Sequence, residues 1–129
     1  MIYGFTGTSH AHLTKKQILA LDVILFPGDE FHHGDCINSD ADAHKEAITS
    51  RCIVVIHPCT IESKRAFCQG ANTVLEPKKP LDRNKDIVDA CDILIAAPMD
   101  DEREELRSGT WATIRYARKI NKPIIMLER

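Results

Sequence analysis

Two short segments of this chain combine glycine with hydroxyl side chains, a pattern that suits a phosphate group. The first is Thr6, Gly7, Thr8 and Ser9, and the second is Ser108, Gly109 and Thr110. Gly7 lets the backbone approach a ligand closely, and the flanking hydroxyls and amides can donate to phosphate oxygens. Ser108 is placed to begin a helix, whose free amides and positive dipole end favour an anion. Each segment alone is also explained as a turn or a helix cap, so the prediction of phosphate binding depends on the two lying together.

A carboxylate and a guanidinium are candidates for the rest of such a site. Gly34 and Asp35 follow a candidate strand, and the Asp35 carboxylate can accept hydrogen bonds from the hydroxyl pair of a ribose. Its alternative role is to cap the turn into the next helix. Arg83 and Asn84 lie at the start of a predicted helix, where an arginine can bind phosphate through two parallel hydrogen bonds. Pro98, directly after a buried run, is the remaining candidate.

Histidines and carboxylates on and after the same candidate strand raise the alternative of a metal site. Imidazole and carboxylate groups bind zinc. The weaker alternative function is therefore a metal-dependent hydrolase with ligands drawn from His32 or His33, Asp35 and His44. Adjacent residues of a strand point to opposite faces, however, so His32 and His33 cannot easily share one ion. Asp40 and His44 are four residues apart on a predicted helix and can pair with each other. We therefore predict no metal ligand and no cofactor.

The apolar pattern predicts the elements that must position these residues. Apolar runs cover 2–5, 52–56, 93–97 and 124–127, with a weaker candidate strand at 30–33. The runs are continuous rather than alternating, as in parallel strands covered on both faces. Helical patterns fill the gaps and begin near Thr14, Ser39, Asp82 and Ser108. This alternation predicts an α/β, Rossmann-like doubly wound fold, with a mostly parallel five-stranded sheet and helices on both faces.

The longest connection, residues 57–81, indicates where the chain crosses to the other half of the sheet. It can hold a short helix at 62–68 and an edge strand at 73–75. A crossover here places the topological switch point between the first strand and the strand at 93–97. Ligands of open α/β sheets bind at that point, beyond the carboxyl ends of the strands. Both phosphate-binding segments fall at this edge, so the topology predicts that they form one site.

Composition limits the classes of function open to the chain. Its 129 residues are enough for one domain, 1–129, with its own core. The net charge of -2 lacks the basic excess that binding to duplex nucleic acid requires. The sequence has no signal-peptide pattern and no apolar run of bilayer length, and its five cysteines, which form no CxxC pair, are typical of reduced thiols. We therefore expect a cytoplasmic protein that binds neither duplex nucleic acid nor membranes.

Five stretches of the chain, taken in order, resemble one family. They are residues 4–8, 31–36, 80–84, 91–98 and 108–113. The ordered set resembles the small phage and bacterial members of the SLOG superfamily, which joins the DNA-processing protein with the Lonely Guy cytokinin-activating phosphoribohydrolases. The resemblance covers nearly the full length of the chain. It implies a Rossmann-like fold that binds nucleotides or their derivatives.

The resemblance also implies roles for single residues. In the hydrolase branch the matching helix opens with a PGGxGTxxE pattern, whose glycines hold phosphate and whose glutamate serves catalysis. Gly109 and Thr110 match the GT of this pattern, but Thr113 stands at the position of the glutamate and residues 105–108 replace the double glycine. Arg83 looks like the counterpart of an arginine that acts in those hydrolases. The resemblance therefore implies phosphate binding by this chain more strongly than it implies hydrolysis.

Residues and resemblance together predict a protein that binds a nucleotide or a nucleotide-derived phosphorylated small molecule. If it is an enzyme, the expected reaction is cleavage or transfer at an N-glycosidic bond, phosphoribohydrolase-like or deoxyribosyltransferase-like, with Asp35 and Arg83 as catalytic residues. The alternative is a non-catalytic module that senses or sequesters a nucleotide signal. Lonely Guy-like proteins pair through helices that flank the sheet, so the resemblance implies a homodimer or a higher homo-oligomer.

Overall fold

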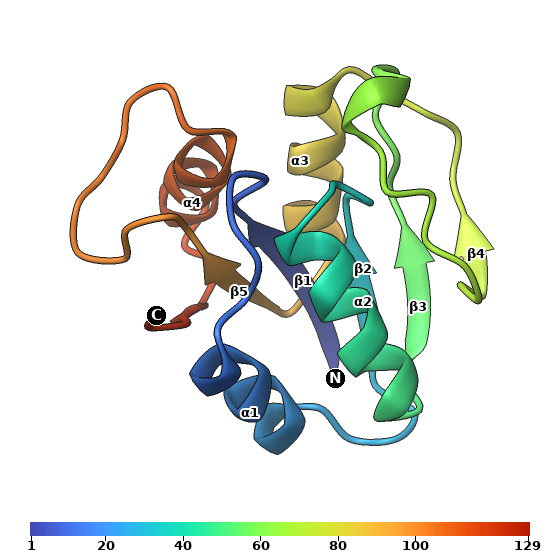
Figure 1. The fold of residues 1–129 in the computed structure, drawn as a ribbon. Coiled ribbons are helices and arrows are strands. Elements are labelled where there is room, and N and C mark those ends of the chain that lie inside the picture. Colours follow the sequence, from blue (N-terminus) through green and yellow to red (C-terminus); the bar gives the residue numbers. More distant parts are fainter.

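A parallel sheet of six strands forms the centre of the structure, a computed structural model that describes residues 1–129 (Figure 1). The strands are β1 (Ile2–Gly7), β2 (Glu30–His33), β3 (Ile53–Ile56), β4 (Thr73–Val74), β5 (Ile93–Ala97) and β6 (Ile124–Met126). Their order across the sheet is β4-β3-β2-β1-β5-β6. Every neighbouring pair is parallel, so all six strands end at the same edge of the sheet.

Four α-helices cover the two faces of this sheet. They are α1 (Lys15–Ile24), α2 (Ser39–Thr49), α3 (Pro80–Ala90) and α4 (Gly109–Lys119), and a short 3-10 helix, η1 (Glu62–Lys64), lies between β3 and β4. Helices α1 and α2 pack together on one face, and α3 and α4 on the other (Figure 1). The start of α1 is fixed by a capping box, in which the Gln17 backbone N–H donates to the Thr14 hydroxyl and the Thr14 backbone N–H donates to the Gln17 side chain.

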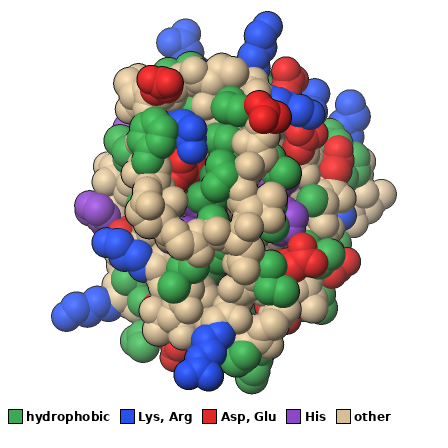
Figure 2. Space-filling model, turned by 90° about the vertical axis from the view of Figure 1, so that its right-hand side faces the viewer, with side chains coloured by type: hydrophobic (Ala, Val, Ile, Leu, Met, Phe, Trp, Pro, Cys, Tyr) green, Lys and Arg blue, Asp and Glu red, His purple; other side chains and the backbone are tan.

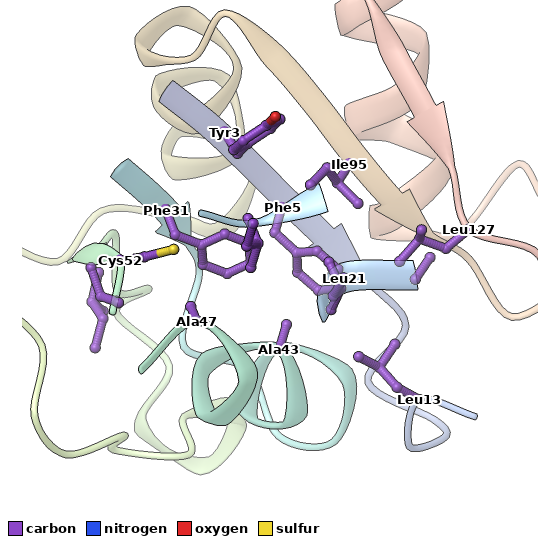
Figure 3. Packing of buried hydrophobic residues seen from close by; sticks show 14 residues of the cluster. Tyr3, Phe5, Leu13, Leu21, Phe31, Ala43, Ala47, Cys52, Ile95 and Leu127 are labelled. Atoms are coloured by element: carbon purple, nitrogen blue, oxygen red, sulfur yellow. The ribbon is translucent and has the colours of Figure 1, made fainter. Parts of the chain in front are cut away.

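The largest group of buried apolar side chains lies between the sheet and the α1–α2 face (Figure 3). Phe5 of β1 and Phe31 of β2 are fully buried there, with ring centroids 5.8 Å apart. Ala43 and Ala47 of α2 face these rings, and their small side chains let the helix approach the sheet closely (Figure 3). This packing fixes the position of α2 over the end of β2.

The predicted fold class is confirmed: the structure is α/β and Rossmann-like, with helices on both faces of a parallel sheet. The sheet has six strands rather than five, because the edge strand expected at 73–75 forms as β4 and pairs with β3. Both residues of β4 are exposed, so no buried apolar run marks it in the sequence. The chain crosses through α3 from β4 to β5, and the switch point lies between β1 and β5, as predicted. None of the helices has the length and apolar character needed to cross a bilayer.

Candidate functional site

A pocket of about 530 Å³ opens beyond the carboxyl ends of β1, β2 and β5, at the switch point of the sheet. The loop after β1, the start of α2, the start of α3 and the start of α4 contribute to its wall. The structure brings most of the sequence-predicted ligand residues together in this wall: Thr6, Gly7, Thr8, Ser9, Gly34, Arg83, Asn84, Ser108, Gly109 and Thr110. Asp35 and Pro98 are not part of it.

The β1 loop and the start of α4 form the part of the wall that suits an anion. The Thr8 backbone N–H donates to the carbonyl of Ala97 at 3.0 Å, which ties the loop to the end of β5. Ser108 is the N-cap of α4, and its hydroxyl accepts from the Trp111 backbone N–H at 3.2 Å. The amides of Gly109 and Thr110, at the first helical positions, have no intrahelical acceptor and remain free for a ligand. The first turn of α4 contains no acidic residue, so nothing there opposes an anion.

Arg83, in the first turn of α3, lines the pocket and is 6% exposed. Its Nη1 donates to the carbonyls of Gly34 and His57 at 2.5 and 3.1 Å, and its Nε donates to the Asn84 side chain at 2.6 Å. Nη2 contacts the sulfur of Cys36 at 3.2 Å. Since a guanidinium has five N–H donors, one on Nη2 is left for a ligand. Arg83 lies where the sequence predicted it, but most of its donors hold β2 and the loop after β3 in place.

Asp40 is a pocket residue that sequence reasoning considered only as a partner of His44. It lies in the first turn of α2 and is 4% exposed. Its Oδ2 accepts from the backbone N–H groups of Gly34 and Cys36, each at 3.2 Å, whereas Oδ1 has no hydrogen-bond partner. Burial raises the pKa of Asp40 to about 6, although Arg83 and these backbone N–H groups act in the opposite direction. The sequence carries no signal that singles out Asp40, since Asp42 lies in the same first turn of α2.

The structure does not bring Asp35 to the pocket, where its expected ribose-binding role would place it. Asp35 is fully buried, and its carboxylate accepts from Arg65 Nε and from the Cys68 backbone N–H, each at 2.9 Å. Burial acts to raise the pKa of Asp35, but the hydrogen bonds from Cys68 and Arg65 outweigh it and lower the pKa. Asp35 therefore ties the loop after η1 to the end of β2. Pro98 is likewise buried at the end of β5, and the next residue, Met99, reaches the pocket instead.

The histidines of β2 make two separate contacts, as the alternation of a strand predicts. His32 Nδ1 lies 2.8 Å from His57 Nε2, and His33 Nε2 lies 2.9 Å from His44 Nδ1. Burial is the main cause that lowers the pKa of His33 to about 3 and that of His57 to about 4, so both rings are neutral at pH 7. These pairs hold elements together from inside the protein and do not line the pocket.

One group of potential metal ligands exists, on His33, His44 and Cys68, with ligand atoms within 4.8 Å of one another. The Asp35 backbone N–H donates to His33 Nδ1 at 3.0 Å, so the proton of this neutral ring lies on Nε2 and donates to His44 Nδ1. His44 Nε2 then donates to the carbonyl of Gln69 at 2.6 Å. Burial raises the pKa of Cys68 to about 12, so its sulfur is a thiol. The ring nitrogens of His33 and His44 are engaged in this chain of hydrogen bonds, and none of the three residues lines the pocket, so the metal-hydrolase alternative is not carried further.

Thr113, at the position of the catalytic glutamate of the hydrolase pattern, is not available for catalysis in the pocket. It is 2% exposed, and its hydroxyl donates to the carbonyl of Gly109 at 2.9 Å within α4. Thr113 does not line the pocket. The helix that opens at the pocket therefore supplies amides to it and no catalytic side chain from this position.

The fold and the pocket define a Rossmann-like α/β protein with a ligand cavity at the switch point of its sheet. No family model matches the chain, and no curated protein matches it. The chain is similar to the molybdenum cofactor binding protein from the phototrophic bacterium Rippkaea orientalis, with 17% identity, a TM-score of 0.71 and coverage of 97% of this chain and 74% of that chain.

Two further solved structures share the fold. One is TM1055, a structural genomics target, with 11% identity, a TM-score of 0.64 and coverage of 95% of this chain and 71% of that chain. The other is DNA processing protein A from Helicobacter pylori, with 18% identity, a TM-score of 0.66 and coverage of 100% of this chain and 66% of that chain. A DNA-processing protein is one of the groups that the SLOG superfamily joins. The three likenesses show that this chain shares their Rossmann-like fold.

Proposed function

We propose that the pocket binds a nucleotide or a nucleotide-derived phosphorylated small molecule, with the phosphate at the start of α4. The observation that carries this proposal is that the two segments predicted to bind phosphate, 6–9 and 108–110, line one pocket. Lys64 and Arg107 also line the pocket, so with Arg83 it has three cationic side chains against the carboxylates of Asp40 and Glu105. This excess of positive charge favours an anionic ligand.

The residues of the pocket favour a binding module over a hydrolase. Cleavage of an N-glycosidic bond builds positive charge on the sugar and needs a carboxylate close to it. Thr113, at the position of the hydrolase glutamate, carries no charge, and Asp35 is engaged elsewhere. Asp40 and Glu105 are the carboxylates that line the pocket, and neither stands at the position of that glutamate. We therefore propose nucleotide binding with weak or absent phosphoribohydrolase activity, and sensing or sequestering of a nucleotide signal as the role.

Binding to nucleic acid is a competing function, because the similar DNA processing protein A from Helicobacter pylori binds single-stranded DNA. This chain has a net charge of -2, which does not favour affinity for a phosphate backbone. On the face at the β4 edge, basic side chains are scattered among acidic and apolar ones rather than gathered in a stripe (Figure 2). A small ligand is therefore our proposal, and an oligonucleotide is a control in its test.

The homo-oligomer remains part of this proposal. Leu19 and Val23, on the outer side of α1, are 65% and 75% exposed, and Phe26, just after the helix, is 66% exposed. Apolar side chains gathered in this way are typical of a surface that another copy covers. Light scattering at micromolar concentration tests this part of the proposal.

The experiment that tests nucleotide binding is calorimetric titration with the common nucleoside 5′-monophosphates, inorganic phosphate and a single-stranded oligonucleotide. The variant Gly109→Val should weaken nucleotide binding at least tenfold, because its branched side chain would cover the free amides of α4. Gly109→Ala is the matched control: a Cβ at this residue meets nothing within 4 Å, so binding should persist. Equal affinity of wild type and Gly109→Val would move the phosphate site away from α4.

A further inference from the structure

Asp40 lines the pocket, and its carboxylate oxygen Oδ1 is buried without a hydrogen-bond partner. Oδ2 is held by the backbone N–H groups of Gly34 and Cys36, which fixes the direction in which Oδ1 points. Oδ1 has no hydrogen-bond donor, and the whole residue is 4% exposed. A buried carboxylate oxygen without a donor is unfavourable, and such an atom in a pocket wall marks a place where a ligand supplies the donor.

The charges around Asp40 indicate which kind of donor fits. Arg83, with Nη1 bonded to the Gly34 carbonyl, lies beside Asp40 and acts to lower its pKa, so the two opposite charges offset each other at this end of the pocket. A phosphate group would be repelled by Asp40, and a cation by Arg83. A neutral group with an O–H donor, such as a sugar hydroxyl, meets neither repulsion.

The strand order separates this end of the pocket from the anion-binding end. Asp40 bonds to the residues that follow β2, whereas the free amides of α4 follow β5, and β1 lies between these two strands. Two strand spacings amount to roughly 10 Å. A ribose 5-phosphate has its phosphate on one side of the ring and its hydroxyl pair on the other, which matches this separation.

We propose, on the basis of the proposed function, that Asp40 Oδ1 accepts a hydrogen bond from a ribose hydroxyl of the bound nucleotide. The proposal gives the ligand a direction: phosphate at the start of α4, and sugar at the end of β2. It also makes the site selective for ribonucleotides over the analogue that lacks the bonded hydroxyl. Asp40 takes the role that the sequence suggested for Asp35, five residues earlier.

The test compares adenosine 5′-monophosphate with its 2′-deoxy and 3′-deoxy forms by calorimetry, with inorganic phosphate as the reference ligand. Wild type should bind the parent nucleotide about ten- to a hundredfold more tightly than one of the two deoxy forms, as expected for a hydrogen bond to a charged acceptor. Inorganic phosphate, which lacks the sugar, should bind without regard to Asp40.

Asp40→Asn sharpens the comparison, because the asparagine oxygen can keep the bonds from Gly34 and Cys36 while its NH₂ replaces the free acceptor with a donor. Because a hydroxyl can also accept from this NH₂, but without the charge of the carboxylate, the variant should weaken the preference for the hydroxyl and retain its affinity for phosphate. Glu46→Gln, the same loss of charge on α2 outside the pocket, is the matched control and should keep the preference.

Three outcomes would overturn the inference. Equal binding of all three nucleotides by wild type, or an unchanged preference in Asp40→Asn, would show that Asp40 does not contact the sugar, while leaving nucleotide binding intact. If wild type binds no nucleotide and no phosphate, the proposed function itself fails and the inference fails with it. The wild-type comparison decides the matter even if Asp40→Asn does not fold.

Discussion

Replacing Gly34 by alanine should disturb both the stability of the fold and the pocket, because Arg83 fills the space in which a Cβ would lie. A Cβ at residue 34 would lie 2.5 Å from Arg83 Nη1 and 2.8 Å from Cζ, well inside contact distance. Gly34 is not one of the glycines with positive φ, so alanine brings no backbone strain and the contact with Arg83 is the whole effect. The guanidinium must move, and it is almost fully buried and hydrogen-bonded on every nitrogen.

The magnitude follows from the bonds that this movement breaks. Nη1 holds the carbonyls of Gly34 and His57, and a hydrogen bond from a charged donor contributes about 1.5–3 kcal/mol. The guanidinium can recover part of this with new partners, and forcing a methyl group into a packed site costs about 1–3 kcal/mol. We therefore expect Gly34→Ala to lower the free energy of unfolding by about 2–4 kcal/mol. Nucleotide affinity should fall as well, since the displaced Arg83 lines the pocket.

Urea unfolding followed by circular dichroism measures the stability change, and calorimetry measures the affinity. Gly109→Ala serves as the control, since a Cβ there meets nothing within 4 Å, and its free energy of unfolding should stay unchanged or rise by up to about 1 kcal/mol. Wild-type stability in Gly34→Ala would refute the reasoning, because it would mean that Arg83 is not held against residue 34.

Four further predictions concern acid stability, Asp35, catalysis and assembly. The pKa values of His33 and His57, lowered to about 3 and about 4, stabilise the fold above pH 6.5, and this contribution is lost as the pH falls; each ring should cost about 2 kcal/mol at pH 5, partly offset by the raised pKa of Asp40, and urea unfolding at pH 7 and pH 5 measures the net loss. Asp35→Asn should lower stability by about 1–3 kcal/mol through its bonds to Arg65 and Cys68, and calorimetry should find nucleotide affinity retained, whereas lost affinity in a folded variant would return Asp35 to the site. Chromatography of nucleoside monophosphates after incubation should detect little free base, and rapid release would show that a catalytic group has been overlooked. Light scattering should give a dimer or larger species that Leu19→Asp dissociates, and a wild-type monomer mass would exclude the homo-oligomer.

Much of the fold could be predicted because local signals and long-range packing agree. The buried runs at β1 and β5 are continuous since helices cover both faces, and the capping residues Thr14 and Ser108 mark helix starts that form as expected. The extra strand β4 has two exposed residues and is defined only by pairing with β3. No local pattern distinguishes such a strand from a loop.

The site was predicted less completely, because topology identifies the end of a strand but not the direction of each side chain beyond it. Asp35 has φ of 59°, a left-handed conformation, and its carboxylate meets Arg65 and Cys68 rather than the pocket. Asp40 reaches the pocket because α2 packs closely over β2, a tertiary arrangement that no motif in the sequence encodes. Arg83 was placed correctly, but its bonds to backbone carbonyls become visible only in the folded chain.

A crystal structure of the protein grown with adenosine 5′-monophosphate tests the central claim most directly. We expect density for the nucleotide in the pocket at the switch point, with phosphate oxygens on the free amides of Gly109 and Thr110 and a ribose hydroxyl on Asp40. Density at another surface, or an empty pocket at a concentration that saturates binding in solution, would contradict it.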